Sequence, residues 1–230
     1  MWRASSRLPG QLSKEFINSF ARILVVLVTV LFVTAPAFAD SAEDYLHSGV
    51  AKAKNGDIVG GLSALDKAIE LNPNFADAYF SRGLVKSKKN DLKGAIADYT
   101  KAIDIQHDYF QAFDSRGIAK AAQGDLDGAI RDYNKAIELN PSNARPYSNR
   151  GLAEFNKGDL SGALADYNKA VELSPKSFQP YINRGIVEST IGDTKAANAD
   201  FITAIGLNPE AKKLIEAQGY SAKVVVGAKP

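Results

Sequence analysis

The apolar residues of the chain follow a pattern that repeats every 34 residues between positions 42 and 211. Each copy carries small residues at its positions 8, 20 and 27 and bulky residues, mostly aromatic, at its positions 4 and 24. Near its middle each copy has Gly or Asn followed by Asp, residues that end one helix in the left-handed conformation and cap the next. Each copy is therefore predicted to form a helix, a tight turn and a second helix.

A fixed period of this length indicates stacked units whose neighbours bury one continuous core. We expect the small and the bulky residues to face each other across paired helices, as close packing requires. In four copies the second helix should end before a proline; His107 replaces that proline in the second copy, where we expect a softer helix end. The five copies span residues 42–75, 76–109, 110–143, 144–177 and 178–211.

This pattern of aromatic, small and proline positions resembles that of the tetratricopeptide repeat family over residues 42–211. The departures are Ser or Arg at position 7, Lys or Glu at position 11, and Leu65 at position 24 of the first copy. The resemblance implies an all-α fold, a right-handed superhelical solenoid of five helix-turn-helix repeats with a C-terminal capping helix. Residues 212–230 are then a capping segment, in which Leu214, Ile215 and Ala217 cover the last helix face, and a tail.

An internal correlation predicts ion pairs inside the array. Arg at position 7 and Asp at position 23 occur together in repeats 2 to 5 and are both missing from repeat 1, which has Ser48 and Ala64. A guanidinium at a half-buried helix contact needs a carboxylate, so we expect Arg–Asp bridges within or between repeats. The alternative is that duplicated units share these residues by ancestry without contact. The pairs are Arg82 and Asp98, Arg116 and Asp132, Arg150 and Asp166, and Arg184 and Asp200.

The resemblance also implies where a partner binds, because the first helix of each tetratricopeptide repeat lines the concave face. Position 9 in those helices is aliphatic in every repeat, and amide side chains lie near it. Such a surface suits an extended peptide or a partner helix; the alternative is that position 9 packs against the neighbouring repeat. The predicted groove residues are Leu46, Val50, Phe80, Leu84, Ile118, Asn149, Leu152, Phe155, Asn183 and Ile186.

The N-terminal segment is basic and then apolar, and it ends with small residues at Ala37 and Ala39. This pattern predicts a signal peptide over residues 1–39, cleaved after Ala39, and hence a periplasmic or secreted protein. The alternative is an uncleaved segment that anchors the chain in the membrane. Its removal takes away four basic residues and one acidic residue, so the formal net charge falls from +2 to −1. A mature chain near neutrality gives no electrostatic reason to expect nucleic acid as a partner.

The sequence contains few residues that could form a catalytic, cofactor or metal site. It has no Cys and two His in unrelated positions, and its glycines punctuate the repeats instead of forming a phosphate-binding loop. We therefore predict no catalytic residue, cofactor or metal site, and no enzyme activity. The predicted function is a scaffold or adaptor of the cell envelope, in a bacterial periplasm, that binds a protein or peptide in its groove. The assignment to the envelope rests on the signal peptide alone, and a eukaryotic secretory or organelle-lumen route would use a similar signal. The alternative is a self-associating or structural component of a larger envelope assembly.

Overall fold

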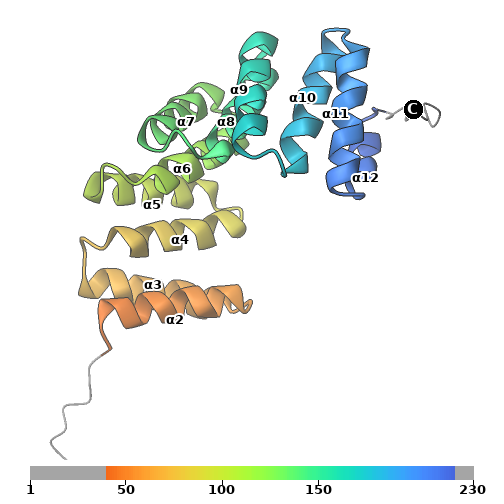
Figure 1. Cartoon of the computed structure of the whole chain (residues 1–230). Helices are drawn as coiled ribbons and strands as arrows, with labels where there is room; N and C mark the ends of the chain where they lie inside the picture. The colour runs from red at the N-terminus through yellow and green to blue at the C-terminus, as the bar shows by residue number, and fades with distance from the viewer. Residues whose placement is uncertain (1–39, 221–230) are drawn as a thin grey trace, which may run out of the picture. The chain divides into compact units, whose positions relative to one another are not determined.

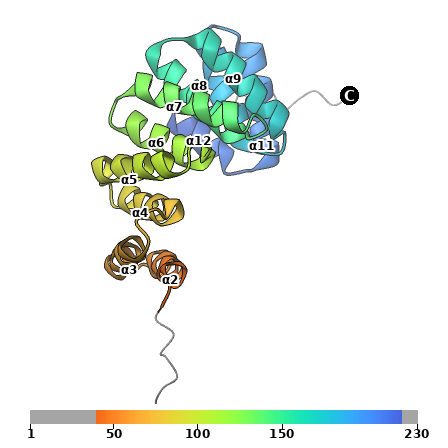
Figure 2. The ribbon, with the colours of Figure 1, turned by 90° about the vertical axis from the view of Figure 1, so that its left-hand side faces the viewer.

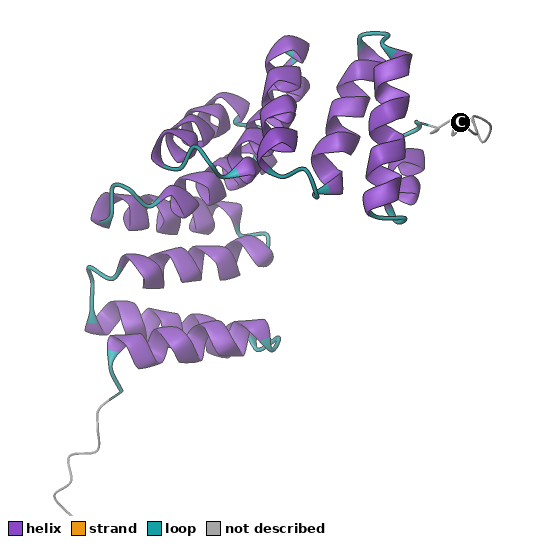
Figure 3. Cartoon of the chain, viewed as in Figure 1, coloured by secondary structure: helices purple, strands orange, loops and turns teal. Residues whose placement is uncertain are grey.

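The computed structural model describes residues 40–220, which form helices and turns without a strand (Figure 3). The predicted signal peptide at 1–39, with its cleavage point, and the tail at 221–230 lie outside the described residues. The helix pairs are α2 (Ala42–Lys54) with α3 (Ile58–Leu71), α4 (Ala76–Lys88) with α5 (Leu92–Ile105), α6 (Phe110–Ala122) with α7 (Leu126–Leu139), α8 (Ala144–Lys157) with α9 (Leu160–Leu173), and α10 (Phe178–Thr190) with α11 (Thr194–Leu207), followed by α12 (Ala211–Ala217).

Consecutive helices are spatial neighbours throughout the array. The two helices of each repeat pack against each other, and the second helix of a repeat packs against the first helix of the next. In Figure 1 the pairs follow one another in chain order from α2 and α3 to α10 and α11, and Figure 2 shows the same order from α2 and α3 to α8 and α9. The prediction of an all-α array of stacked helix-turn-helix repeats is confirmed.

The turn inside each repeat has the conformation that its residues predict. Position 15 has a positive φ in all five repeats, from 63° at Asn90 to 92° at Gly56. The Asp that follows accepts a hydrogen bond from the backbone N–H three residues on, at 2.9 to 3.0 Å. An N-cap of this kind stabilises a helix by about 1 kcal/mol. Each turn therefore ends one helix and starts the next at a fixed residue.

The core of each repeat is a bulky side chain set against a glycine. A Cβ atom added at Gly117 would lie 2.6 Å from Cε1 of Tyr133, so only glycine fits there without a shift. The predicted contact between small and bulky positions is confirmed. The buried position-24 residues are Leu65, Tyr99, Tyr133, Tyr167 and Phe201.

The helix end at His107 does not differ from the others. α5 ends at Ile105, and the N–H of Gln106 donates to the carbonyl of Ala102 at 2.9 Å, the distance found at the other second helices. The imidazole Nδ1 of His107 lies 3.0 Å from the carbonyl oxygen of Ile103. The expected softer end is not seen in this geometry.

The capping helix covers less than the sequence predicts. α12 buries Ala211 and Ile215 in one cluster with Phe201. Leu214 and Ala217 are exposed, which corrects the expectation that they cover the last helix face. The reason is the length of α12, because a helix of two turns presents one narrow stripe, here residues four apart, to its neighbours.

Candidate peptide-binding groove

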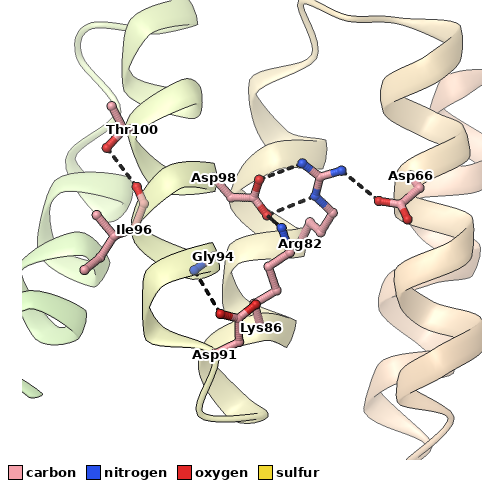
Figure 4. A network of polar contacts seen from close by, with 8 residues as sticks. All are labelled: Asp66, Arg82, Lys86, Asp91, Gly94, Ile96, Asp98 and Thr100. Atoms are coloured by element: carbon pink, nitrogen blue, oxygen red, sulfur yellow. Dashed lines mark hydrogen bonds and ion pairs between the residues drawn. The ribbon is translucent and has the colours of Figure 1, made fainter. Parts of the chain in front are cut away.

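Arginine and aspartate join the two helices of repeats 2 to 5 at a contact that we call the seam. In repeat 2, Nε and Nη2 of Arg82 donate to the two carboxylate oxygens of Asp98 at 2.9 and 2.6 Å (Figure 4). Repeats 3 to 5 have the same two-bond contact at 2.6 to 2.9 Å. The aspartates are buried, so each seam is a charge-assisted, bidentate ion pair. The predicted Arg–Asp bridge is confirmed.

The seam arginine also binds the preceding repeat, which the sequence analysis did not anticipate. Its Nη1 donates to position 25 of the preceding second helix, as Arg82 does to Asp66 at 2.7 Å (Figure 4). The later acceptors are Thr100 at 3.0 Å, Asn134 at 2.5 Å and Asn168 at 2.8 Å. Each guanidinium further lies 5.5 to 5.8 Å from the ring centre at position 4, within range for a cation–π contact. One arginine thus connects three helices.

The three-helix contact explains why repeat 1 lacks the Arg–Asp pair. No described helix precedes repeat 1, so an arginine at its position 7 would have no position-25 acceptor, and the chain has Ser48 and Ala64 there. At the other end, position 25 of repeat 5 is Ile202, which is 47% exposed. Within residues 40–220, the hydrogen-bonding residues are therefore missing at the two positions that no further repeat adjoins.

Position 11 adds a second charge to each seam, and its sign changes along the chain. In repeats 2 and 3, Nζ of Lys86 and Lys120 lies 2.8 Å from the seam aspartate. In repeats 4 and 5 the residue is Glu154 or Glu188, whose Oε1 lies 3.8 Å from the arginine Nε. Oε2 of both glutamates is buried and has no hydrogen-bond partner among the described residues.

Burial and neighbouring negative charge together raise the pKa of these two glutamates above that of an ordinary glutamate. Burial, and next the negative charge of Asp166, raise the pKa of Glu154 to about 7, against the lowering effect of Arg150. Burial and then Asp200 likewise raise the pKa of Glu188 to about 7. Near neutral pH each glutamate is therefore partly protonated.

The aliphatic residues at position 9 form an exposed row in four repeats. Val50, Leu84, Ile118 and Leu152 are 41 to 49% exposed, so they do not pack inside a neighbouring repeat. Ile186 is the exception at 7%, because it lies in the cluster that α12 covers with Ile215. The row is open to a partner from repeat 1 to repeat 4.

Two hollows meet on α8 and together form what we call the groove. One of about 370 Å³ lies between α8 and α10, and one of about 290 Å³ lies between α6 and α8. None of the lining residues is charged, although 23% of the chain is. The first hollow is lined by Ser148, Asn149, Leu152, Phe155, Tyr167, Gln179, Asn183, Ile186 and Gln218, and the second by Ile118, Ala121, Ala122, Tyr133, Asn149, Leu152, Ala153 and Asn156.

Amide groups in the groove are oriented by their hydrogen bonds. Nδ2 of Asn149 donates at 2.9 Å to the buried Asp114, whose other oxygen is paired with Arg145 at 2.5 Å. A carboxylate only accepts, so this contact leaves the Asn149 carbonyl oxygen as an acceptor for a ligand. Nε2 of Gln179 donates to Oδ1 of Asn183 at 3.0 Å, which leaves the Asn183 nitrogen as a donor. An extended backbone needs both kinds of partner.

The predicted groove residues fall into three groups. Val50 and Leu84 are exposed in the same row but outside these two hollows. Leu46 and Phe80 are half-buried between helices, and the Phe80 ring lies 4.9 Å from that of Tyr109. The groove brings together the remaining ones, Ile118, Asn149, Leu152, Phe155, Asn183 and Ile186.

The lining residues that were not on the predicted list include Gln179 and Gln218. Gln179 is at position 2, which varies among the repeats and could have been included on that ground. Gln218 follows α12, outside the repeats, so the period carries no information about it. Within residues 40–220, no helix is long and apolar enough to cross a membrane, and no cluster of three or more His, Cys, Asp or Glu could hold a metal.

Comparisons with known proteins agree with this architecture. The family described as TPR repeat matches residues 117–158 and 151–188, and the one described as Tetratricopeptide repeat matches residues 64–97. No curated protein matches the chain.

Solved structures with a similar fold include the MamA protein, at 21% identity and a TM-score of 0.66, over 84% of this chain and 100% of that one. YrrB, described as a TPR protein with an unusual peptide-binding site, has 22% identity and a TM-score of 0.64, over 79% and 94%. PilF of Pseudomonas aeruginosa has 18% identity and a TM-score of 0.66, over 77% and 86%.

These identities are low, so the solved structures bear on the fold alone. The repeat matches fall inside the array of helix pairs, whose turns, caps and glycine contacts are those that the repeat pattern requires. Repeats of this family are interaction modules and not enzymes. The chain is a tetratricopeptide repeat protein.

Proposed function

We propose that this protein is an exported bacterial adaptor that binds a peptide or an extended segment of a partner protein in the groove of α6, α8 and α10. The observation that carries the proposal is the uncharged groove with an exposed aliphatic row and oriented amides. Aliphatic side chains take up apolar residues of a ligand, and amides satisfy its backbone. The peptide-binding site described for YrrB supports the same use of the fold.

The export half of the proposal rests on the N-terminal sequence. A basic segment, an apolar run and small residues before Asp40 are the features of a secretory signal. Mass spectrometry of the protein purified from its native cells should give a chain that begins at Asp40. A chain that retains residues 1–39 would contradict cleavage.

The alternative function, self-assembly by continued stacking, is disfavoured by the ends of the array. If repeat 1 of a second copy stacked on repeat 5, its position-7 residue, Ser48, would face the position-25 residue, Ile202. The hydrogen bond from arginine that joins consecutive repeats would then be missing. Light scattering of the purified protein should therefore give a monomer mass that does not change with concentration. A mass that rises with concentration would favour the structural role.

The groove itself is tested by partner capture from the native cell envelope. We expect replacement by Asn of Ile118 and Leu152 in the groove, together with Leu84 next to them in the exposed row, to abolish capture of a protein that the unmodified chain retains. Val59→Asn is the matched control, because Val59 is an aliphatic residue with 76% exposure on α3, away from the first-helix row. If the triple variant still captured that partner, the proposed groove would be wrong.

A further inference from the structure

The groove lies beside the point at which the described chain ends. Gln218, directly after α12, lines the hollow between α8 and α10. Tyr220 packs against the cluster that contains Ile186 and Phe155, and its ring centre lies 6.0 Å from that of Phe201. Any segment that follows Tyr220 therefore starts at the edge of this hollow.

The middle of the segment that follows Tyr220, between Lys223 and Lys229, has the composition that the hollow accepts. The segment reads SAKVVVGAKP, and the five residues from Val224 to Ala228 are uncharged. The three valines are β-branched and favour an extended backbone, the conformation that a groove lined by amides binds. An uncharged segment also loses no ion hydration when it enters an uncharged hollow, whereas a charged one would.

The length of the connection allows the contact. Val224 is the fourth residue after Tyr220, and an extended chain spans about 3.3 Å per residue, or about 13 Å over these four steps. A hollow of about 370 Å³ is within the size range of ligand sites. A tethered segment moreover has an effective concentration of about millimolar, so even a weak contact is occupied.

The other hollows suit this segment less well. One near repeat 1 is lined by Lys52, Asp66, Lys67 and Glu70, and one between the ends of α8 and α10 includes Arg145. Both would leave the valines next to ionised groups, which cost free energy to desolvate. The uncharged hollow next to Gln218 is the better match.

We propose that the C-terminal segment 221–230 binds in the hollow between α8 and α10 of its own chain and competes there with the external ligand. This inference rests on the proposed function, since it assigns a competitor to the same groove. The segment acts as a tethered, self-inhibiting peptide, and a partner binds at full strength only when it displaces the valines.

Disulfide trapping in the full chain tests the contact, because the sequence has no native cysteine to interfere. We expect a Leu152→Cys, Val225→Cys variant to form a disulfide within one chain at least tenfold faster than a Val50→Cys, Val225→Cys control. Leu152 and Val50 are matched, both at position 9 and similarly exposed. Equal rates would overturn the proposal, and so would a disulfide between two chains, which would indicate a second copy as the occupant.

A labelled peptide of residues 221–230 gives an independent measurement. Its affinity for a chain that stops after Tyr220 should exceed its affinity for the full chain at least tenfold, because the tethered segment competes. A Val225→Asp peptide should not bind. Equal affinity for the two chains would overturn the proposal.

The outcome is separable from that of the proposed function. If the tail measurements fail while the groove substitutions still abolish partner capture, only this inference is wrong. If the groove substitutions leave the partner bound, the proposed function fails whatever the tail does.

Discussion

Repeats 2 and 3 and repeats 4 and 5 have the same helices and the same Arg–Asp seam, yet they differ in one charge. Lys86 and Lys120 give the buried aspartate a second cation, whereas Glu154 and Glu188 give the arginine a second carboxylate. The first arrangement has an excess of positive charge, and the second is neutral only while the glutamate holds a proton. The repeats thus keep the same fold while the sign of the charge at position 11 reverses, because helix caps and glycine contacts determine the fold.

The largest expected difference between the two regions follows removal of the seam carboxylate. Asp132→Asn leaves two cations, Arg116 and Lys120, half-buried without a counter-ion, and should lower the free energy of unfolding by about 3–5 kcal/mol. Asp166→Asn should cost less than half as much, because Glu154 remains beside Arg150. Urea unfolding of both variants measures this. Equal losses would show that position 11 does not substitute for the aspartate.

The glycine contact gives a second comparison. Gly117→Ala should destabilise by about 1–3 kcal/mol through overpacking, because its Cβ would lie 2.6 Å from Tyr133. The nearest atoms to a Cβ at Gly151 are 3.2 Å away, on Asp166 and Tyr167, and alanine favours the helix by about 1 kcal/mol. Gly151→Ala should therefore be nearly neutral. Thermal unfolding of the pair measures the difference, and a larger loss at Gly151 would refute this account.

Exchange of the position-11 charge should make repeat 4 behave like repeat 3. Glu154→Lys supplies Asp166 with the second cation that Asp132 receives from Lys120, and should stabilise the protein by about 1 kcal/mol at pH 8. Lys120→Glu is the reciprocal variant and should destabilise. Urea unfolding at pH 8 tests both, and a stabilising Lys120→Glu would contradict the assignment.

The smallest expected effect is the pH dependence, because Arg150 and Arg184 oppose the effect of burial on the pKa of the two glutamates. Their pKa values are raised from 4.5 to about 7, so the folded state binds protons more tightly than the unfolded state. Their contribution to stability is present below about pH 4.5 and is lost as the pH rises through about 7. Glu154→Gln with Glu188→Gln should flatten the stability profile between these values. Glu138→Gln, at a mostly exposed residue, should leave it unchanged.

Much of the fold could be predicted because local chemistry determines it. The Gly-Asp turn and the glycine contact follow from residues of a single repeat. The pairing of Arg150 with Asp166 could be inferred because repeat 1 lacks both the arginine and the aspartate at the corresponding positions. The acceptor role of position 25 could have been found in the same way, since Asn134 and Asn168 give way to Ile202 in the last repeat.

The groove was less predictable because its limits depend on how repeats meet. Ile186 and Leu152 both occupy position 9 of their repeats, yet α12 buries Ile186 whereas Leu152 stays exposed. Phe80 is likewise half-buried because Tyr109, at the end of its own repeat, lies against its ring. Such differences arise from contacts between unlike residues, which a repeated pattern does not describe.

The link from each seam arginine to the preceding repeat gives the array a direction. Loss of the last repeat would expose an amide, Asn168, that water can satisfy, whereas loss of the first would deprive Arg82 of Asp66. If the array folds from its N-terminal end, every arginine meets an acceptor in a repeat that is already in place. The array can therefore assemble one repeat at a time, with each new helix pair completing its hydrogen bonds on the surface of the preceding pair.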